Sequence, residues 1–133
     1  MIIVPDIHGR DFWKRKEVLD GDKVIFLGDY VDPYPHEGIS PDVVPGMIQE
    51  IINIPGATRL LGNHDLSYVL PGMPRCRYSK ETEGDIKELI LGNREKFKLI
   101  HREDNYVYSH SGVFKIWLGD YTEDQINEMW WEK

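Results

Sequence analysis

Four short stretches of the chain carry side chains whose types and spacing could support chemistry at a metal. They read DIHG at residues 6–9, GDYVD at 28–32, GNHD at 62–65 and SHSG at 109–112. Each follows a run of apolar residues typical of a buried strand, so polar groups come where strands end. The side chains that could bind a ligand are Asp6, His8, Asp29, Asp32, Asn63, His64, Asp65 and His110.

These side chains suit a divalent cation. In open α/β sheets, ligands bind outside the carboxyl ends of the strands, so turns far apart in sequence can meet in one cleft. Mixed carboxylate, imidazole and amide ligands suit Mn, Fe or Zn. Asp29 could use its two oxygens to bridge two ions, whose charge would stabilise a carboxylate at the end of an apolar strand.

Each stretch also has a simpler interpretation when it is taken alone. A lone DIH or GDYVD is more often a turn, and the Gly-Asn of GNHD is turn chemistry. His110 by itself could be a hydrogen-bonded histidine of a sheet. Four such stretches in order, each after an apolar strand, favour a shared site over coincidence.

Composition limits the classes of partner. The 133 residues suit one domain, and 16 basic against 23 acidic residues leave a net charge of −7. This balance argues against bulk nucleic-acid binding and against anionic membranes. The single Cys76 excludes an intrachain disulfide and fits a reducing compartment. No transmembrane run or signal-peptide pattern is present, so we expect a cytoplasmic protein.

Three apolar runs predict strands, and their near-continuous apolar character indicates burial on both faces of a parallel sheet. They lie at residues 2–4, 24–27 and 58–61. A hairpin is predicted near the end, with its turn at Asp104 and Asn105. The element order predicts an α/β or α+β fold with a partly parallel sheet, in a single domain over residues 1–133.

Helical periodicity predicts helices over residues 11–19, 40–52 and 82–97 and from Thr122 onward. Gly92 interrupts the third, and Thr122 with Gln125 forms the pattern of a capping box. The second has a predicted core-facing stripe of Val43, Val44, Met47, Ile48, Ile51 and Ile52.

Taken in order, DIHG, GDYVD, GNHD and SHSG resemble the successive motifs of the calcineurin-like metallophosphoesterase superfamily. The likeness runs from residue 2 to about 113 and is closest to the phosphoprotein phosphatases and the diadenosine tetraphosphate hydrolases. It implies a mixed β-sheet sandwich flanked by helices, and a metal-bound hydroxide that attacks phosphorus in line with the leaving group.

The resemblance also assigns roles. Two divalent ions (Mn, Fe or Zn) would be held by five side chains: Asp6 and His8 at the first, Asp29 between the two, and Asn63 and His110 at the second.

The other two roles concern proton transfer. His64 would be the general acid that protonates the leaving oxygen, and Asp32 would hold its ring. A carboxylate beside an imidazole fixes its tautomer and raises its basicity, so the pairing makes physical sense.

The chain departs from the family pattern at two phosphate-binding arginines. Pro33 and Leu61 stand at their positions. Four other arginines could substitute, although each is more often a solvated surface charge; they are Arg10, Arg59, Arg75 and Arg77, of which Arg10 and Arg59 are our candidates for substrate binding.

A further metal-binding histidine of the family has no counterpart after His110. His36 and His101 are the remaining histidines, and we expect both at the surface. The chain also ends within a helical pattern at residues 129–133, so we expect the C-terminal part of the second sheet to be missing. An uncovered sheet edge would then favour a homodimer, whose second chain could complete the site.

The sequence thus predicts a metal-dependent phosphoesterase acting on a phosphorylated small molecule, nucleotide or phosphoprotein. The wording of GDYVD favours a Ser/Thr protein phosphatase, whereas LLGNHDLSYVL favours a dinucleoside polyphosphate hydrolase. The third hypothesis is that the protein is a catalytically impaired binding scaffold. Residues 68–80, rich in aromatic and basic side chains, could form a lid over the cleft or a plain surface loop.

Overall fold

The computed structural model describes residues 1–20, 23–111 and 121–130. Gly112 of the fourth motif, Val113 and the end of the last predicted helix at Trp131 lie outside the described residues. The elements in chain order are β1 (Ile2–Val4), α1 (Lys16–Leu19), β2 (Val24–Phe26), η1 (Pro35–Glu37), η2 (Pro41–Val43), α2 (Val44–Ile52), β3 (Thr58–Arg59), α3 (Asn63–Val69), α4 (Glu83–Gly92), η3 (Arg94–Lys96), β4 (Ile100–Glu103), β5 (Tyr106–Ser109) and α6 (Glu123–Glu128).

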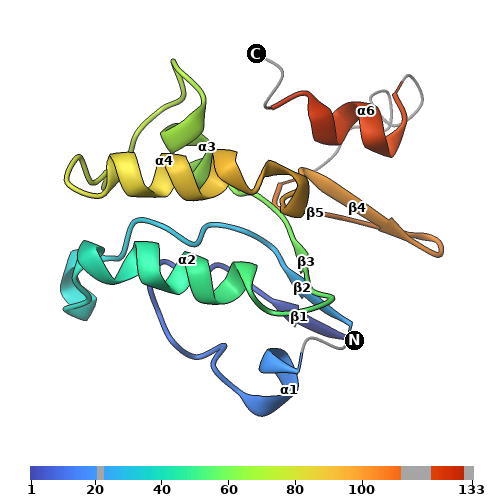
Figure 1. Cartoon of the computed structure of the whole chain (residues 1–133), viewed down its shortest axis with the longest axis horizontal. Helices are drawn as coiled ribbons and strands as arrows, with labels where there is room; N and C mark the ends of the chain where they lie inside the picture. Colours follow the sequence, from blue (N-terminus) through green and yellow to red (C-terminus); the bar gives the residue numbers. More distant parts are fainter. Residues whose placement is uncertain (21–22, 112–120, 131–133) are drawn as a thin grey trace.

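The first three strands form a parallel sheet in the order β1-β2-β3 (Figure 1). All of β2 is buried, as its apolar sequence predicts, whereas Ile3 on the outer strand β1 is 47% exposed. β3 is shorter than predicted, and Leu60, which follows it, pairs with Lys98 of a later part of the chain in an isolated parallel bridge. The predicted α/β class with a partly parallel sheet is confirmed.

The hairpin is also confirmed: β4 and β5 pair antiparallel around a turn at Asp104. α6 begins with the predicted capping box, in which Thr122 Oγ1 accepts from Gln125 N while Gln125 Oε1 accepts from Thr122 N. The side chain of Asn127 on α6 bonds the backbone of Leu99 and Ile100, so this helix is fixed to β4.

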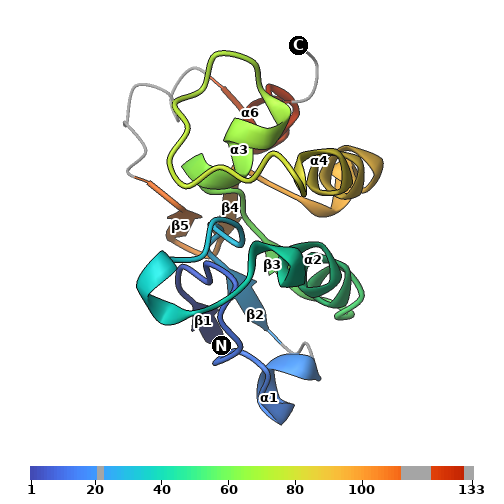
Figure 2. The ribbon, with the colours of Figure 1, turned by 90° about the vertical axis from the view of Figure 1, so that its left-hand side faces the viewer.

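Helices α2 and α4 lie side by side on the same side of the parallel sheet (Figures 1 and 2). The predicted stripe of α2 is buried except for Val43, which is 48% exposed. The reason is that Val43 ends the 3-10 turn η2, where Ser40 Oγ accepts from Asp42 N, and so lies off the α-helical face. The interruption of the third predicted helix at Gly92 is confirmed by the change from α4 to η3.

The first predicted helix is wrong over residues 11–15, because α1 begins only at Lys16. The cause lies in Trp13, whose indole is fully buried and donates to the carbonyl of Arg10. Arg15 is then extended, with φ −121° and ψ 150°, which breaks any helix that began earlier. No helix in the described part of the chain is long and apolar enough to cross a membrane.

Candidate metal centre

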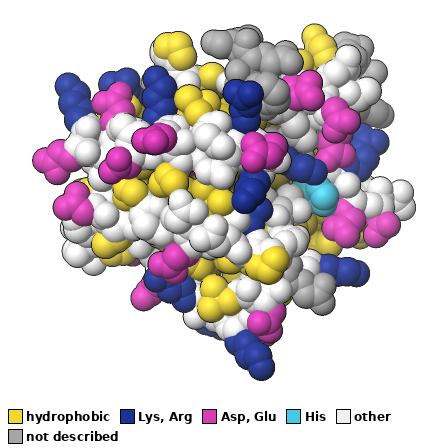
Figure 3. All heavy atoms as spheres, in the orientation of Figure 1, with side chains coloured by type: hydrophobic (Ala, Val, Ile, Leu, Met, Phe, Trp, Pro, Cys, Tyr) yellow, Lys and Arg dark blue, Asp and Glu magenta, His cyan; other side chains and the backbone are white. Residues whose placement is uncertain are grey.

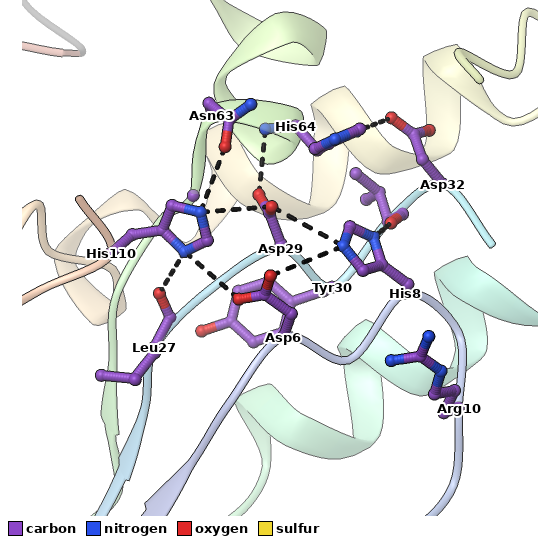
Figure 4. Close-up of polar contacts among 12 residues, drawn as sticks. Asp6, His8, Arg10, Leu27, Asp29, Tyr30, Asp32, Asn63, His64 and His110 are labelled. Carbon is purple, nitrogen blue, oxygen red and sulfur yellow. Dashed lines mark hydrogen bonds and ion pairs between the residues drawn. The ribbon is translucent and has the colours of Figure 1, made fainter. Parts of the chain in front are cut away.

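The polar residues of the four motifs meet at the carboxyl edge of the parallel sheet (Figure 4). The loop after β1 carries Asp6 and His8, and the loop after β2 carries Asp29. His64 lies in the first turn of α3, just after the third strand, and His110 directly follows β5. Parallel pairing explains why the residues after β1, β2 and β3 converge, since strands that run the same way end at one edge. His110 comes from the separate antiparallel hairpin and is held here by the carbonyl of Leu27.

Asp29 is the centre of the cluster. Its Oδ2 lies 3.2 Å from His110 Nε2 and 3.7 Å from His8 Nε2. Asp29, His8 and His64 form one group whose potential ligand atoms lie within 4.8 Å of one another. Asp29, Asp6 and His110 form a second such group. Asp29 belongs to both, the arrangement expected of a carboxylate that bridges two ions.

Asp6 lies nearer to the second group than the resemblance implies. Its Oδ1 is 3.7 Å from His110 Nδ1, and its Oδ2 is 3.8 Å from His8 Nε2, so Asp6 spans the two imidazoles. Asn63 joins the cluster through Oδ1, which lies 3.1 Å from His110 Nε2 (Figure 4). All five residues assigned to metal binding by resemblance are therefore together in space.

The backbone fixes which nitrogen each imidazole turns toward the cluster. His8 Nδ1 lies 2.7 Å from the carbonyl of Val31, and His110 Nδ1 lies 3.0 Å from that of Leu27. A carbonyl only accepts, so both Nδ1 atoms carry a proton and both Nε2 atoms face Asp29. This orientation by an outer carbonyl is typical of histidines that bind metal. The donors present thus fit a divalent ion.

The contact between His110 and Asp29 also changes the pKa of both groups in the metal-free protein. The hydrogen bond to Asp29 is the main cause that raises the pKa of His110 to about 9, and the charge of Asp29 adds to it. Burial acts to raise the pKa of Asp29, but the bond and charge of His110 and the backbone N–H of His64 outweigh it and lower that pKa.

His64 and Asp32 form a second polar unit beside the metal ligands. His64 Nδ1 lies 2.7 Å from Asp32 Oδ2, while the backbone N of His64 donates to Asp29 Oδ1 at 3.0 Å. Burial is the main cause that raises the pKa of Asp32, although its hydrogen bonds with Tyr68 and His64 work against it. Nδ1 of His64 is thus engaged, which leaves Nε2 for other chemistry.

Three residues of the cluster have left-handed backbone. The φ angles are 45° at His8, 55° at Asp29 and 62° at Asp32. For residues with a Cβ this region costs about 1–3 kcal/mol each and persists where the surroundings impose it, commonly at functional sites. Each turn is therefore held in the shape that directs its side chain inward.

A comparison with protein-family models finds a match to the calcineurin-like phosphoesterases over residues 2–133. The chain belongs to this family. The resemblance carried by the four motifs is thereby confirmed, and the family points to a hydrolase of phosphate esters that works with metal ions. Comparisons with curated proteins and with solved structures found no match.

One residue of this calcineurin-like phosphoesterase has a role that the sequence did not predict. Asp65 is fully buried and accepts from the backbone N–H groups of Asp29, Tyr30 and Gly62 at 2.7–2.9 Å. Burial is the main cause that raises its pKa to about 7. Asp65 thus fixes the turn that carries Asp29 to the start of α3. The sequence feature that could have indicated this role is the capping pattern of α3, in which Asp65 lies three residues after Gly62.

The arginines of this phosphoesterase lie in different environments. Arg59 is 6% exposed and donates to the carbonyls of Ile51, Ile52, Ile54 and Ala57, so its predicted contact with substrate is wrong. The carbonyls at and just after the end of α2 attract this cation, since the last carbonyls of a helix lack the usual i+4 partner and carry the negative end of its dipole.

The other three candidate arginines lie nearer to the surface. Arg10 lies beside His8 (Figure 4) and forms an ion pair with Glu37 at 2.9 Å. Arg75 lies over the ring of Tyr78, and Arg77 donates to the carbonyl of Asp32.

The two spare histidines belong to neither candidate ligand group in the described residues. His36 is exposed beside Tyr34, and His101 lies near Glu103 and Glu123.

Proposed function

We propose that this calcineurin-like phosphoesterase binds two divalent ions and hydrolyses a phosphate monoester. The observation that carries the proposal is the position of Asp29, which is shared by both ligand groups and faced by Nε2 of both His8 and His110. Ions bound there would activate water and neutralise charge on the phosphoryl group.

The donors divide between two ion positions around Asp29. His8 lies on one side of its carboxylate and His110 with Asn63 on the other, while Asp6 lies between the two imidazoles (Figure 4). Asp6, whose side chain is 50% exposed, marks the open side, where water and a substrate can enter. No thiolate is among these ligands, which favours Mn, Fe or Zn bound by oxygen and nitrogen.

His64 is suited to protonate the leaving oxygen. Its Nδ1 is held by Asp32 at 2.7 Å, and its ring stands edge-on to that of His8 at 5.0 Å between centroids. Nε2 of an imidazolium in this place can donate a proton to a group that departs from phosphorus. The chain therefore offers an acid beside the metal ligands without further rearrangement.

Metal stoichiometry tests the proposal. The protein is dialysed against limiting manganese and its ions are counted by elemental analysis, with wild type expected to hold two per chain. Asp29→Asn should lose both, since a neutral amide cannot bridge two cations as a carboxylate does. The control is Asp85→Asn, which changes an exposed residue in the first turn of α4 and should keep both ions. Wild type that binds no ion would support a binding scaffold and overturn the proposal.

A substrate comparison then addresses the class of ester. A phosphoserine peptide and diadenosine tetraphosphate are offered to the manganese-loaded protein, and released phosphate or nucleotide is measured. Faster turnover of the peptide would support a protein phosphatase, whereas cleavage of the dinucleotide alone would overturn the proposed monoester specificity.

A further inference from the structure

Tyr68 reaches the acid pair from the end of α3. It lies one helical turn after His64, and its hydroxyl oxygen is 2.5 Å from Asp32 Oδ1. The other oxygen of this carboxylate, Oδ2, faces His64 Nδ1 at 2.7 Å. Asp32 thus has one hydrogen-bond partner at each oxygen, and both partners come from the same helix.

The direction of the hydrogen bonds is fixed by the backbone of Ser79. Its N–H donates to the Tyr68 oxygen at 2.8 Å, since a backbone N–H can only donate. The single phenolic proton of Tyr68 is then free to go to Asp32 Oδ1. That oxygen acts as an acceptor, so the carboxylate is held by donors at both ends.

The segment from Tyr68 to Ser79 holds this arrangement in place. The ring of Tyr78 stacks on that of Tyr68, with centroids 4.2 Å apart and planes 15° apart. Arg77 Nε donates to the backbone carbonyl of Asp32 at 3.2 Å, and the Arg77 guanidinium lies 3.9 Å from the ring centre of Tyr34. The two ends of this segment therefore lie against the acid pair, whereas most of residues 71–76 between them are exposed.

We propose that Tyr68 is a positioning residue for the acid His64, acting through Asp32; this rests on the proposed function. A carboxylate with one donor can rotate about its Cβ–Cγ bond and tilt the imidazole that it holds. With a second donor at Oδ1 that rotation is restrained, and His64 Nε2 stays directed toward the leaving oxygen. Second-layer partners of this kind are worth about 10–100-fold in activity.

If the hydroxyl of Tyr68 had a purely structural role, a different hydrogen-bond acceptor would be expected. A buried phenol needs one acceptor, and any backbone carbonyl would satisfy it. Tyr30 shows that case, since its hydroxyl donates to the carbonyl of Leu60. Tyr68 instead donates to a carboxylate that is 2% exposed and already engaged with His64.

The test compares Tyr68→Phe with wild type in two ways. In the metal-free protein, the His64 Nδ1 proton is followed by NMR, its signal assigned by loss in His64→Asn. We expect its exchange with water to become faster in Tyr68→Phe, because the hydrogen bond from His64 to a less restrained Asp32 opens more often. In the manganese-loaded protein, kcat should fall about 10-fold for an alkyl phosphate, whose leaving group needs a proton, and little for p-nitrophenyl phosphate.

Two further variants sharpen the test. Tyr78→Phe removes a hydroxyl from the ring stacked on Tyr68 but leaves the bond to Asp32, so it should behave as wild type in both measurements. Once Asp32→Ala is present, adding Tyr68→Phe should change kcat no further, because Tyr68 acts through Asp32.

The proposal is overturned if Tyr68→Phe, folded by circular dichroism, keeps wild-type exchange at His64 and loses activity equally on both esters. Wild type that hydrolyses neither ester would count against the proposed function instead, and the NMR comparison would still decide whether Tyr68 positions His64.

Discussion

Asp29 and His110 face each other across the site, with Asp29 Oδ2 3.2 Å from His110 Nε2, although they come from different sheets of the fold. Each side chain also has a hydrogen bond to the backbone: Asp29 accepts from the amide of His64, and His110 donates to the carbonyl of Leu27. The two side chains are therefore held at hydrogen-bond distance, and the raised pKa of His110 favours a protonated Nε2 that donates to Asp29 in the metal-free protein.

The first prediction is that metal binding releases this proton. The pKa of His110 is raised to about 9 from an ordinary value of 6.5, so His110 is protonated at pH 7.5 in the metal-free protein. A cation must displace that proton to bind Nε2. Titration calorimetry with manganese at pH 7.5, in two buffers of different ionisation enthalpy, should show about one proton released. His110→Gln should abolish the release, and a buffer-independent enthalpy in wild type would contradict the prediction.

The same pair predicts how the stability of the metal-free protein depends on pH. A pKa raised on folding stabilises the native state below the unfolded value near 6.5, and this contribution disappears as pH rises through about 9. The lowered pKa of Asp29 has the opposite sense, so its contribution is present above about pH 4 and is lost as pH falls through the lowered value.

Thermal melting with chelator measures this dependence. The Tm of wild type should fall from pH 6 to pH 9.5 more than that of His110→Gln. Equal slopes for the two proteins would show that the Asp29–His110 pair contributes nothing to folding.

Asp65 gives the next prediction. Its two carboxylate oxygens accept from three backbone donors, at Asp29, Tyr30 and Gly62. Asp65→Asn places an NH2 group against at least one of them, so a buried donor loses its acceptor. We expect a loss of about 1–3 kcal/mol in the free energy of unfolding, measured by urea denaturation.

Asp85→Asn is the matched control for this substitution. It makes the same chemical change in the exposed first turn of α4 and should stay within about 0.5 kcal/mol of wild type. Equal stability of the two variants would contradict the anchoring role of Asp65.

The clustering of the candidate metal ligands could be predicted from the sequence because most of them follow apolar strands that are parallel. A strand end can be read locally, and the sheet then brings the ends together. His110 is the harder case, since β5 belongs to a separate sheet, and there the prediction depended on the family pattern.

The residues that the sequence did not reveal act through tertiary contacts. Tyr68 and Asp65 have no local pattern that names their partners across the site, Asp32 and the backbone at Asp29. The first helix was overpredicted for a related reason, since Trp13 turns into the core from a loop. Arg59 looked like a free cation because the carbonyls at the end of α2 cannot be seen in the sequence.

The close approach of Gly62 to the carboxylate of Asp29 leads to a further prediction. A Cβ on Gly62 would overlap Asp29 Oδ1 and lie 2.7 Å from the backbone N of Asp29. Both contacts lie on the turn that Asp65 fixes, so the carboxylate would have to move. Gly62→Ala should therefore lower manganese binding by about 10-fold or more in calorimetry. Gly46→Ala, in α2 with open space around it, should bind normally and be stabilised by about 0.5–1 kcal/mol. Normal metal binding by Gly62→Ala would contradict the prediction and show that the turn at Asp29 can move to accommodate the methyl group.

Arg59 predicts a change in stability without a change in substrate affinity. Its guanidinium donates to four carbonyls near the end of α2, and an ammonium group cannot reach them in the same fork. Arg59→Lys should lower the free energy of unfolding by about 2 kcal/mol, while KM for p-nitrophenyl phosphate stays at the wild-type value. Arg102→Lys makes the same exchange on the exposed face of β4 and should change neither. A raised KM with unaltered stability in Arg59→Lys would instead support a role of Arg59 in substrate binding.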